Sequence, residues 1–134
     1  MQHHSKPEPR ADGLNAEFYA NAANHELRFQ KCGTCGTWRH MPRHTCAECG
    51  SPKWSWERSS GRGKLYSWTV THRAFHPGFD HDIPYAVAVV ELEEGVRMVS
   101  QIEDLAIRDY TIGAPLVVTF ADRGGYKLPM FRPA

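Results

Sequence analysis

The residues with the most definite chemistry in this 134-residue sequence are its four cysteines. They form two Cys-x-x-Cys pairs, Cys32 with Cys35 and Cys46 with Cys49, and ten residues separate the pairs. A two-residue gap lets both thiolates of a tight turn face one ion, and two such turns supply four sulfurs at about 2.3 Å from a tetrahedral zinc. A glycine follows each pair and can adopt the positive φ that such a turn needs. The spacing therefore predicts a structural Zn²⁺ site.

Two other uses of these cysteines are disulfide bonding and redox catalysis. Disulfides belong mainly to secreted proteins, and no hydrophobic run typical of a signal peptide precedes Cys32. A redox Cys-x-x-Cys motif needs a single pair, within a βαβ pattern that this sequence lacks. Both alternatives are less consistent with the sequence than zinc.

The segment between the two cysteine pairs is basic. It contains Arg39 and Arg43, and residues 28–62 hold seven Lys/Arg against two acids. In a zinc ribbon this segment is a hairpin, so the two arginines either face solvent or contact a phosphate or an acidic partner. The sequence leaves these two interpretations open.

A second candidate site is the segment 72–82, which is rich in polar and aromatic side chains. Its three histidines, two aspartates and two phenylalanines are His72, His76, His81, Asp80, Asp82, Phe75 and Phe79. Some of these could bind a metal or act as acid and base, but a loop centred on Pro-Gly lacks the rigid support that catalysis requires. We therefore expect no catalytic residue here. Two large rings in a polar loop instead predict a contact surface formed by Phe75, His76 and Phe79.

Composition places these motifs in a small globular chain. Its length allows one domain or two small modules. The formal net charge of +1 gives no overall case for nucleic-acid binding, and no segment is long and apolar enough to cross a membrane. Free cysteines committed to a metal, together with the absence of an export signal, predict a cytoplasmic location.

The pattern along the chain divides it into three regions. Residues 1–12 are polar and are expected to be disordered, residues 13–60 are expected to form a helix and the zinc ribbon, and residues 61–134 a barrel. In the helix, apolar residues recur at Leu14, Phe18 and Ala22. The helix either covers the local core or docks on a partner through Phe18 and Tyr19. Glycines and serines at 59–63 are expected to form a hinge between ribbon and barrel.

The sequence pattern after residue 60 predicts five strands. The first starts at Lys64, with Leu65, Ser67 and Thr69 expected on one face, and the others are expected at 84–92, 96–102, 115–121 and 126–131. A hairpin between strands two and three, and an irregular connection before strand four, match a five-stranded barrel of the oligonucleotide/oligosaccharide-binding (OB) type. An SH3-like barrel is the alternative. The predicted fold class is mainly β: an N-terminal helix, a rubredoxin-like zinc ribbon and an OB-fold barrel.

Several motifs together resemble a known family. They are Cys-x-x-Cys-Gly, a short hairpin with Pro-Arg, Cys-x-x-Cys-Gly-Ser, Ser-Gly-Arg-Gly, His-x-x-Phe-His-Pro-Gly-Phe and the closing Leu-Pro-Met-Phe-Arg-Pro, within residues 14–133. This combination is similar to the acyl-CoA-associated zinc-ribbon/OB-fold proteins, long catalogued as a domain of unknown function. The resemblance implies a non-catalytic partner of thiolase-like enzymes, or of lipid-transfer-type retro-aldolases that shorten steroid side chains held on coenzyme A. It also implies a heterotetramer with two copies of each chain and an acyl-CoA site shared with the partner.

An alternative function is single-stranded nucleic-acid binding by the barrel. Tyr66 and Trp68 would then stack under the bases. From residue 62 onward the chain has eight Lys/Arg against nine Asp/Glu. Such a balance does not favour a groove that follows a phosphate backbone, so nucleic acid is not expected to be the partner.

Overall fold

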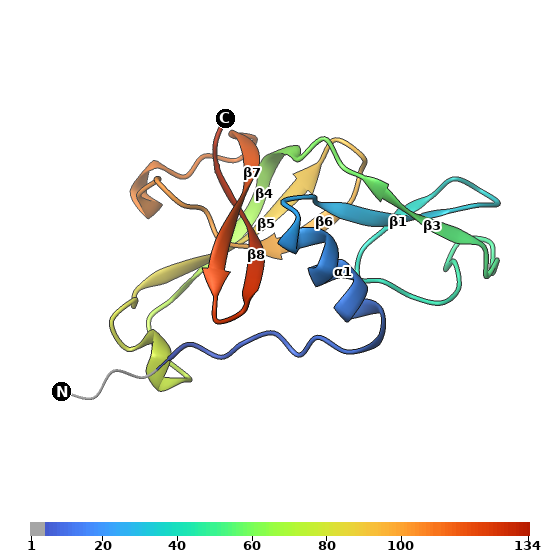
Figure 1. The fold of residues 1–134 in the computed structure, drawn as a ribbon. Coiled ribbons are helices and arrows are strands. Elements are labelled where there is room, and N and C mark those ends of the chain that lie inside the picture. Colours follow the sequence, from blue (N-terminus) through green and yellow to red (C-terminus); the bar gives the residue numbers. More distant parts are fainter. Residues whose placement is uncertain (1–4) are drawn as a thin grey trace.

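The computed structural model describes residues 5–134, and Figure 1 shows one helix followed by two β-sheets. The helix and the ribbon strands are α1 (Gly13–Ala23), β1 (Arg28–Cys32), β2 (Trp38–Arg39) and β3 (Trp54–Arg58). The barrel strands are β4 (Arg62–Thr71), β5 (Tyr85–Leu92), β6 (Arg97–Ser100), β7 (Pro115–Arg123) and β8 (Tyr126–Pro133). Two short 3₁₀ helices, η1 (Pro77–Phe79) and η2 (Ile107–Asp109), lie in the connections. No helix in the described part of the chain is long and apolar enough to span a membrane.

The first sheet is the zinc ribbon. Its order is β2-β1-β3, with β1 antiparallel to both neighbours. Cys32 pairs with Trp54 at the end of β1, so the first cysteine turn begins where the sheet ends. The sheet, whose strands β1 and β3 are labelled in Figure 1, therefore fixes the position of the first cysteine.

The second sheet has the order β6-β5-β4-β7-β8 and curls towards closure. The closing contact joins the chain just after β6 to β8: Glu103 N–H donates to Phe131 O at 2.7 Å, and Phe131 N–H donates to Gln101 O at 3.0 Å. This parallel contact between the third and fifth barrel strands confirms the predicted OB-type barrel. The five strands and the β5–β6 hairpin were all predictable from apolar runs and turn residues.

One detail of the first barrel strand differs from the prediction. The register of β4 against β5 shifts between Leu65 and Ser67, which is a β-bulge. Leu65 is fully buried, Ser67 and Thr69 are exposed, and Trp68 is half-buried. The expected common face of Leu65, Ser67 and Thr69 is therefore wrong, because the extra residue reverses the alternation after Leu65.

Ribbon, helix and barrel share one hydrophobic core. Phe18 of α1 and Leu27 and Phe29 at the start of the ribbon belong to the same buried cluster as the barrel residues, among them Leu65 and Phe131. Phe29 and Phe131 have no exposed surface. The small ribbon thus gains apolar burial that it could not provide alone.

The expected hinge at residues 59–63 is packed rather than open. Ser59 is buried, its N–H donates to Leu27 O at 2.8 Å, and its hydroxyl donates to Glu94 in the β5–β6 turn. Ser60 N–H donates to the other oxygen of Glu94 at 3.1 Å. These bonds hold the linker to the barrel, so the hinge prediction is wrong.

Gly63 is required by the close approach of two strands. It pairs with Leu92 on one side and Leu116 on the other, and a Cβ placed on it would lie 2.5 Å from Glu91 O. We expect Gly63→Ala to lower the free energy of unfolding by about 2 kcal/mol, as over-packing does. Urea unfolding monitored by tryptophan fluorescence measures this. Gly125→Ala is the control, because a Cβ there meets nothing within 4 Å; equal midpoints for the two variants would contradict the argument.

The lead-in to the helix runs extended over the barrel. Lys6 Nζ lies 2.6 Å from Asp82 Oδ2 and 5.4 Å from the centre of the Phe79 ring. Arg123 donates to Pro7 O at 3.4 Å. The region 1–12 was expected to be disordered; residues 5–12 have these contacts, and residues 1–4 lie outside the described part of the chain.

Candidate metal centre and partner-binding residues

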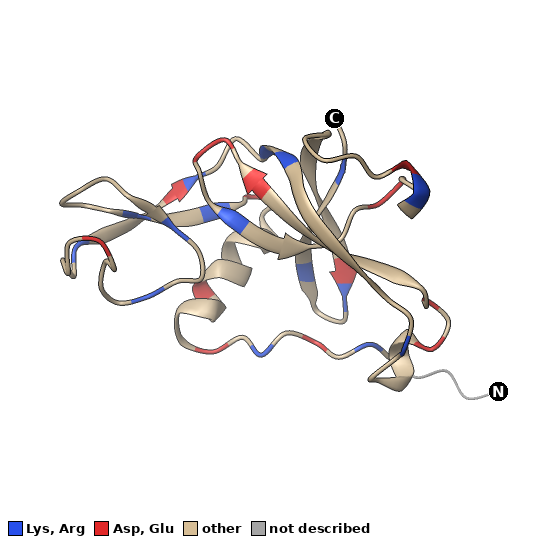
Figure 2. Ribbon diagram, turned by 180° about the vertical axis from the view of Figure 1, so that it is seen from behind, with Lys and Arg blue, Asp and Glu red and all other residues tan. Residues whose placement is uncertain are grey.

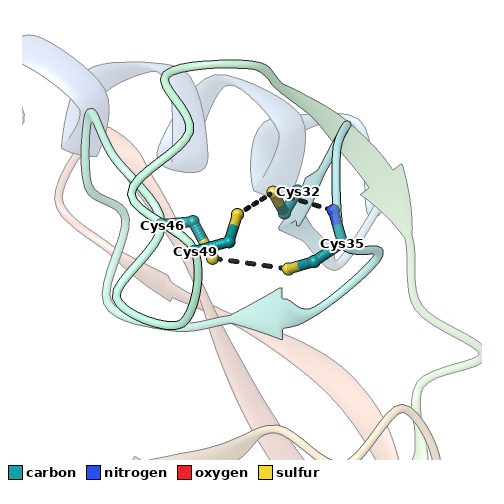
Figure 3. A group of neighbouring side chains, drawn as sticks. All are labelled: Cys32, Cys35, Cys46 and Cys49. Carbon is teal, nitrogen blue, oxygen red and sulfur yellow. Dashed lines mark hydrogen bonds between the residues drawn. The ribbon is translucent and has the colours of Figure 1, made fainter.

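The four cysteine sulfurs converge on one point (Figure 3). All four lie within 4.8 Å of one another, and the Sγ–Sγ distances of Cys32–Cys49 and Cys35–Cys46 are both 3.6 Å. Four sulfurs at about 2.3 Å from a tetrahedral zinc are about 3.8 Å apart. The sulfur positions therefore fit a bound zinc ion without rearrangement.

The backbone around the site favours thiolates. Cys35 N–H and Thr34 N–H donate to Cys32 Sγ at 3.5 and 3.4 Å, and these bonds lower the pKa of Cys32 to about 6. The pKa of Cys49 is instead raised to about 11: the backbone N–H of Ser51 lowers it, but burial and the neighbouring sulfurs outweigh that effect. A divalent cation removes this conflict because it stabilises all four thiolates together.

The chemistry of the donor set decides the role of the metal. Four thiolates close a tetrahedral zinc and leave no position for water or substrate, which is typical of structural sites. The turn glycines Gly36 and Gly50 have φ of +77° and +75°, as expected for residues after each cysteine pair. The zinc site is structural, and it joins the two turns of the ribbon.

Arg39 is a structural residue of the ribbon hairpin. Its Nε donates to Gln30 Oε1 at 2.7 Å, and its Nη2 donates to Arg43 O at 2.9 Å. The same oxygen of Gln30 accepts from Arg43 N–H at 2.7 Å. Arg39 therefore holds the backbone of the loop, whereas the Arg43 side chain is exposed. Gln30 is completely buried, and the sequence did not identify it as a structural residue. A glutamine in a strand that alternates apolar and polar residues is expected to face solvent, so the sequence gives no sign of its burial.

His40 follows Arg39 and is largely buried between aromatic rings. Its ring centre lies 5.2 Å from that of Phe18 and 5.3 Å from that of Phe29. Desolvation lowers the pKa of His40 to about 4 from 6.5. The neutral imidazole is therefore part of the core between α1 and the ribbon.

The pKa of His40 makes stability depend on pH. Its folded pKa is below the unfolded value, so the unfolded chain binds the proton more tightly and stability falls as pH drops from about 6.5 towards 4. We expect a loss of about 2 kcal/mol between pH 7 and pH 5. Urea titrations at both pH values measure it. The control is His40→Gln, which removes the titrating imidazole and leaves the acid-sensitive zinc ligands in place. If the stability of this variant depended on pH as steeply as that of wild type, the assignment to His40 would be wrong.

The helix acts mainly as a cover for the core. Phe18 is 6% exposed, so the expected partner contact through Phe18 does not fit its position. Tyr19 is half-buried, with its ring centre 5.9 Å from that of Tyr126 on β8. Glu17 accepts a hydrogen bond from Trp56 Nε1 at 3.2 Å, which ties the helix to the ribbon.

The loop between β4 and β5 contains one largely exposed aromatic ring. Phe75 is 82% exposed, whereas Phe79 is half-buried and stacks on Tyr85 with ring centres 5.5 Å apart. His76 Nδ1 accepts from Gly78 N–H at 2.9 Å and so caps η1. The histidines and aspartates of this loop do not form a group that could bind a metal; within residues 5–134 the four cysteines are the only such group of three or more side chains. Phe75 is therefore available for contact, whereas His76 and Phe79 stabilise the loop itself.

The barrel surface does not present the base-stacking platform of the alternative function. Arg97 lies over the Tyr66 ring, with Cζ 3.9 Å from the ring centre, and Trp68 packs against Tyr110 at 5.5 Å. Figure 2 shows basic and acidic positions interspersed along the barrel strands rather than gathered on one side. A nucleic-acid backbone is bound by gathered positive charge, and these strands carry mixed charge instead.

Comparisons with known protein families agree with the two-module structure. Residues 20–55 match the ChsH2 rubredoxin-like zinc ribbon domain, and residues 56–121 match the ChsH2 C-terminal OB-fold domain. The first match ends within β3, the last strand of the ribbon sheet.

Three similar curated proteins cover different shares of the chain. A probable enoyl-CoA hydratase alpha subunit of Thermomonospora curvata is 38% identical over 96% of this chain, and a 3-oxo-4,17-pregnadiene-20-carboxyl-CoA hydratase alpha subunit of Mycobacterium tuberculosis is 33% identical over 93% of it. The chain spans only 40% and 39% of the length of these two relatives. A DUF35 domain-containing scaffold protein of Methanocaldococcus jannaschii is 37% identical over 67% of this chain and 64% of its own length.

Two solved structures share the architecture. A chain of the structure titled "Ltp2-ChsH2(DUF35) aldolase" is 37% identical, with a TM-score of 0.85 over 94% of this chain and 98% of that chain. A DUF35 protein from Sulfolobus solfataricus has a TM-score of 0.64 at 13% identity over 92% of this chain and 87% of its own, which supports the fold alone. With its zinc ribbon, its OB-fold barrel and these relatives, the chain belongs to the ChsH2 zinc-ribbon/OB-fold family, also called DUF35.

Proposed function

We propose that this chain is a non-catalytic accessory subunit of a thiolase-fold enzyme that acts on acyl-CoA. The observation that best supports this proposal is the structural similarity to a chain of an Ltp2-ChsH2 aldolase, which covers 98% of that chain. The names of the archaeal relatives, which are scaffold proteins, support a role in assembly. We further propose a complex with two copies of each chain, in the cytoplasm, and an acyl-CoA of the steroid side-chain type as its substrate.

The zinc site supports a non-catalytic role. Its four sulfurs leave no coordination position at which water or a thioester carbonyl could be activated. In the β4–β5 loop, His76 caps a turn rather than pairing with a nucleophile. The chemistry of the complex would then take place on the partner, and this chain would bind the partner and complete or cover its acyl-CoA site.

An assay of the separate and combined proteins tests this function. The chain alone is expected to give no turnover with any acyl-CoA, whereas a thiolase-fold partner enzyme from the same host is expected to gain activity or stability when the chain is added. A His76→Ala variant provides the internal check. Turnover by the isolated chain that is lost in this variant would make the β4–β5 loop an active site and would overturn the proposal.

Phe75 is the proposed aromatic anchor for the partner. Aromatic side chains at the centre of an interface commonly cost about 2 kcal/mol or more when truncated, which is roughly thirtyfold in affinity. We expect Phe75→Ala to weaken the complex by at least that factor and to leave the melting temperature unchanged, since the ring is 82% exposed. Calorimetric titration of the partner, beside a thermal melt of the same variant, measures both.

Phe79→Ala is the matched comparison in the same loop. Phe79 stacks on Tyr85 and lies under Lys6, so its truncation is expected to lower the melting temperature. Wild-type affinity in the Phe75→Ala variant would show that the exposed ring is not a contact. Tyr19, Arg43 and His76 remain proposed contacts of smaller effect, because each has part of its side chain at the surface.

A further inference from the structure

The barrel has an open seam between its two edge strands. β6 and β8 are the outer strands of the five-stranded sheet. They meet only at the end of β6, where the Ser100 hydroxyl donates to Pro129 O, and just beyond it, where residues 101–103 meet Phe131. Alongside β6 itself there is a cavity of about 390 Å³. Its walls come from α1, the loop at His40 and Met41, and strands β5, β6 and β8. We call this cavity the β6 groove.

The two edges of the seam differ in what they offer to another chain. On the β8 side the groove is lined by Pro129, which has no N–H, and Pro129 O already accepts from the Ser100 hydroxyl at 2.8 Å. On the other side, β6 pairs with β5 alone among the described strands. The outer edge of β6 therefore keeps backbone groups that an added strand can pair with.

The groove and its rim are apolar. Met41 is 57% exposed and Val99 is 67% exposed, although both are large hydrophobic residues. Val89, the cross-strand partner of Val99, and Val87, which lines the groove, lie on the outer face of β5, where an antiparallel strand facing water usually has polar residues. Two-sided apolar strands of this kind are typical of sheets that are covered on both faces.

The groove carries a positive charge and no negative charge. Its only ionisable cation is Arg123, no carboxylate lines it, and His40 in its wall is neutral because burial lowers its pKa to about 4. Arg123 makes a 3.4 Å hydrogen bond to Pro7 O, and its Cζ lies 5.7 Å from the centre of the Phe79 ring, but it forms no ion pair within the described residues. An apolar segment with one carboxylate complements such a groove.

We propose that the β6 groove receives an extended apolar segment of the thiolase-fold partner, which pairs with the edge of β6 and places a carboxylate beside Arg123. This inference rests on the proposed function. It adds a second contact region, separate from the Phe75 loop. A chain that pairs by its backbone needs no deep pocket, and an open strand edge provides the directional hydrogen bonds.

Three variants test the groove by titration with a thiolase-fold enzyme from the same host. Val99→Glu places a charge on the apolar rim and is expected to weaken binding at least about thirtyfold, as loss of a central contact does. Arg123→Gln removes the charge but keeps a polar side chain, and it is expected to weaken binding roughly five- to tenfold, with reduced salt dependence. Ile112→Glu is the matched control, because Ile112 is 63% exposed and lies outside the groove; its affinity should stay within about twofold of wild type.

Hydrogen exchange gives a readout that does not depend on substitution. The amides of Met98–Ser100 are expected to gain protection when the partner is added, and thermal melts of all three variants should match wild type. If wild type binds the partner but Val99→Glu binds equally well and these amides stay unprotected, the groove proposal is wrong and the accessory function stands. If wild type does not bind, both are wrong. Protection already present in the free chain, and lost on deletion of residues 1–10, would assign the groove to the chain's own N-terminal segment and overturn the proposal.

Discussion

Loss of the zinc ion is expected to unfold the ribbon and to destabilise the barrel with it. Zinc binding supplies on the order of 10 kcal/mol of folding free energy in modules of this size, which is comparable to the whole stability of a small domain. Cys32→Ala or Cys46→Ala removes one of four sulfurs that lie within 4.8 Å of one another. The barrel follows because Leu27 and Phe29, at the start of the ribbon, belong to its core.

Metal analysis and circular dichroism melts of these variants provide the measurement. Glu48→Ala is the control, because it lies in the second cysteine turn without being a ligand. Its zinc content and melting temperature are expected to equal those of wild type. Well under one zinc per chain in a wild-type protein whose ribbon is folded would contradict the structural role of the metal.

Phe29→Ala is expected to cost about 3–5 kcal/mol, as truncation of a buried aromatic ring usually does. Phe29 has no exposed surface and contacts the helix, ribbon and barrel parts of one cluster. The variant should therefore unfold in one transition at lower urea, with helix, ribbon and barrel signals lost together. Urea unfolding followed by far-ultraviolet circular dichroism and by tryptophan fluorescence measures this.

Phe75→Ala is the matched control, since it removes the same ring from a position that is 82% exposed. Its effect on stability should stay within about 0.5 kcal/mol. Two separate transitions in Phe29→Ala, with the barrel unchanged, would show that ribbon and barrel fold independently and that the shared core has little energetic weight.

The sequence was sufficient for features that depend on local spacing. The Cys-x-x-Cys pairs fix the zinc site because each turn needs only four residues to place two sulfurs. Apolar runs such as 85–90 and turn residues such as Gly95 identified the barrel strands and the β5–β6 hairpin. The family resemblance added the order of helix, ribbon and barrel; the two family matches confirm the order of ribbon and barrel, and the structure places the helix before them.

Features that depend on distant contacts were not predictable. The pattern of residues 59–63 indicates flexibility, but hydrogen bonds that Ser59 and Ser60 donate to the carboxylates of Glu93 and Glu94, more than thirty residues later, hold this segment in place. The helix pattern favoured a cover for the local core but left a partner contact through Phe18 open, because the pattern alone does not say what lies opposite it. The bulge in β4 reversed a face for the same reason: it is set by pairing with β5 rather than by the sequence of β4.

The most direct test of the accessory role is purification of the tagged, full-length chain from its own host, followed by mass measurement of the intact complex. The account predicts a stoichiometric thiolase-fold enzyme, with two copies of each chain and one zinc per copy of this chain. Recovery of this chain without a thiolase-fold enzyme, whether alone or with nucleic acid, would contradict it.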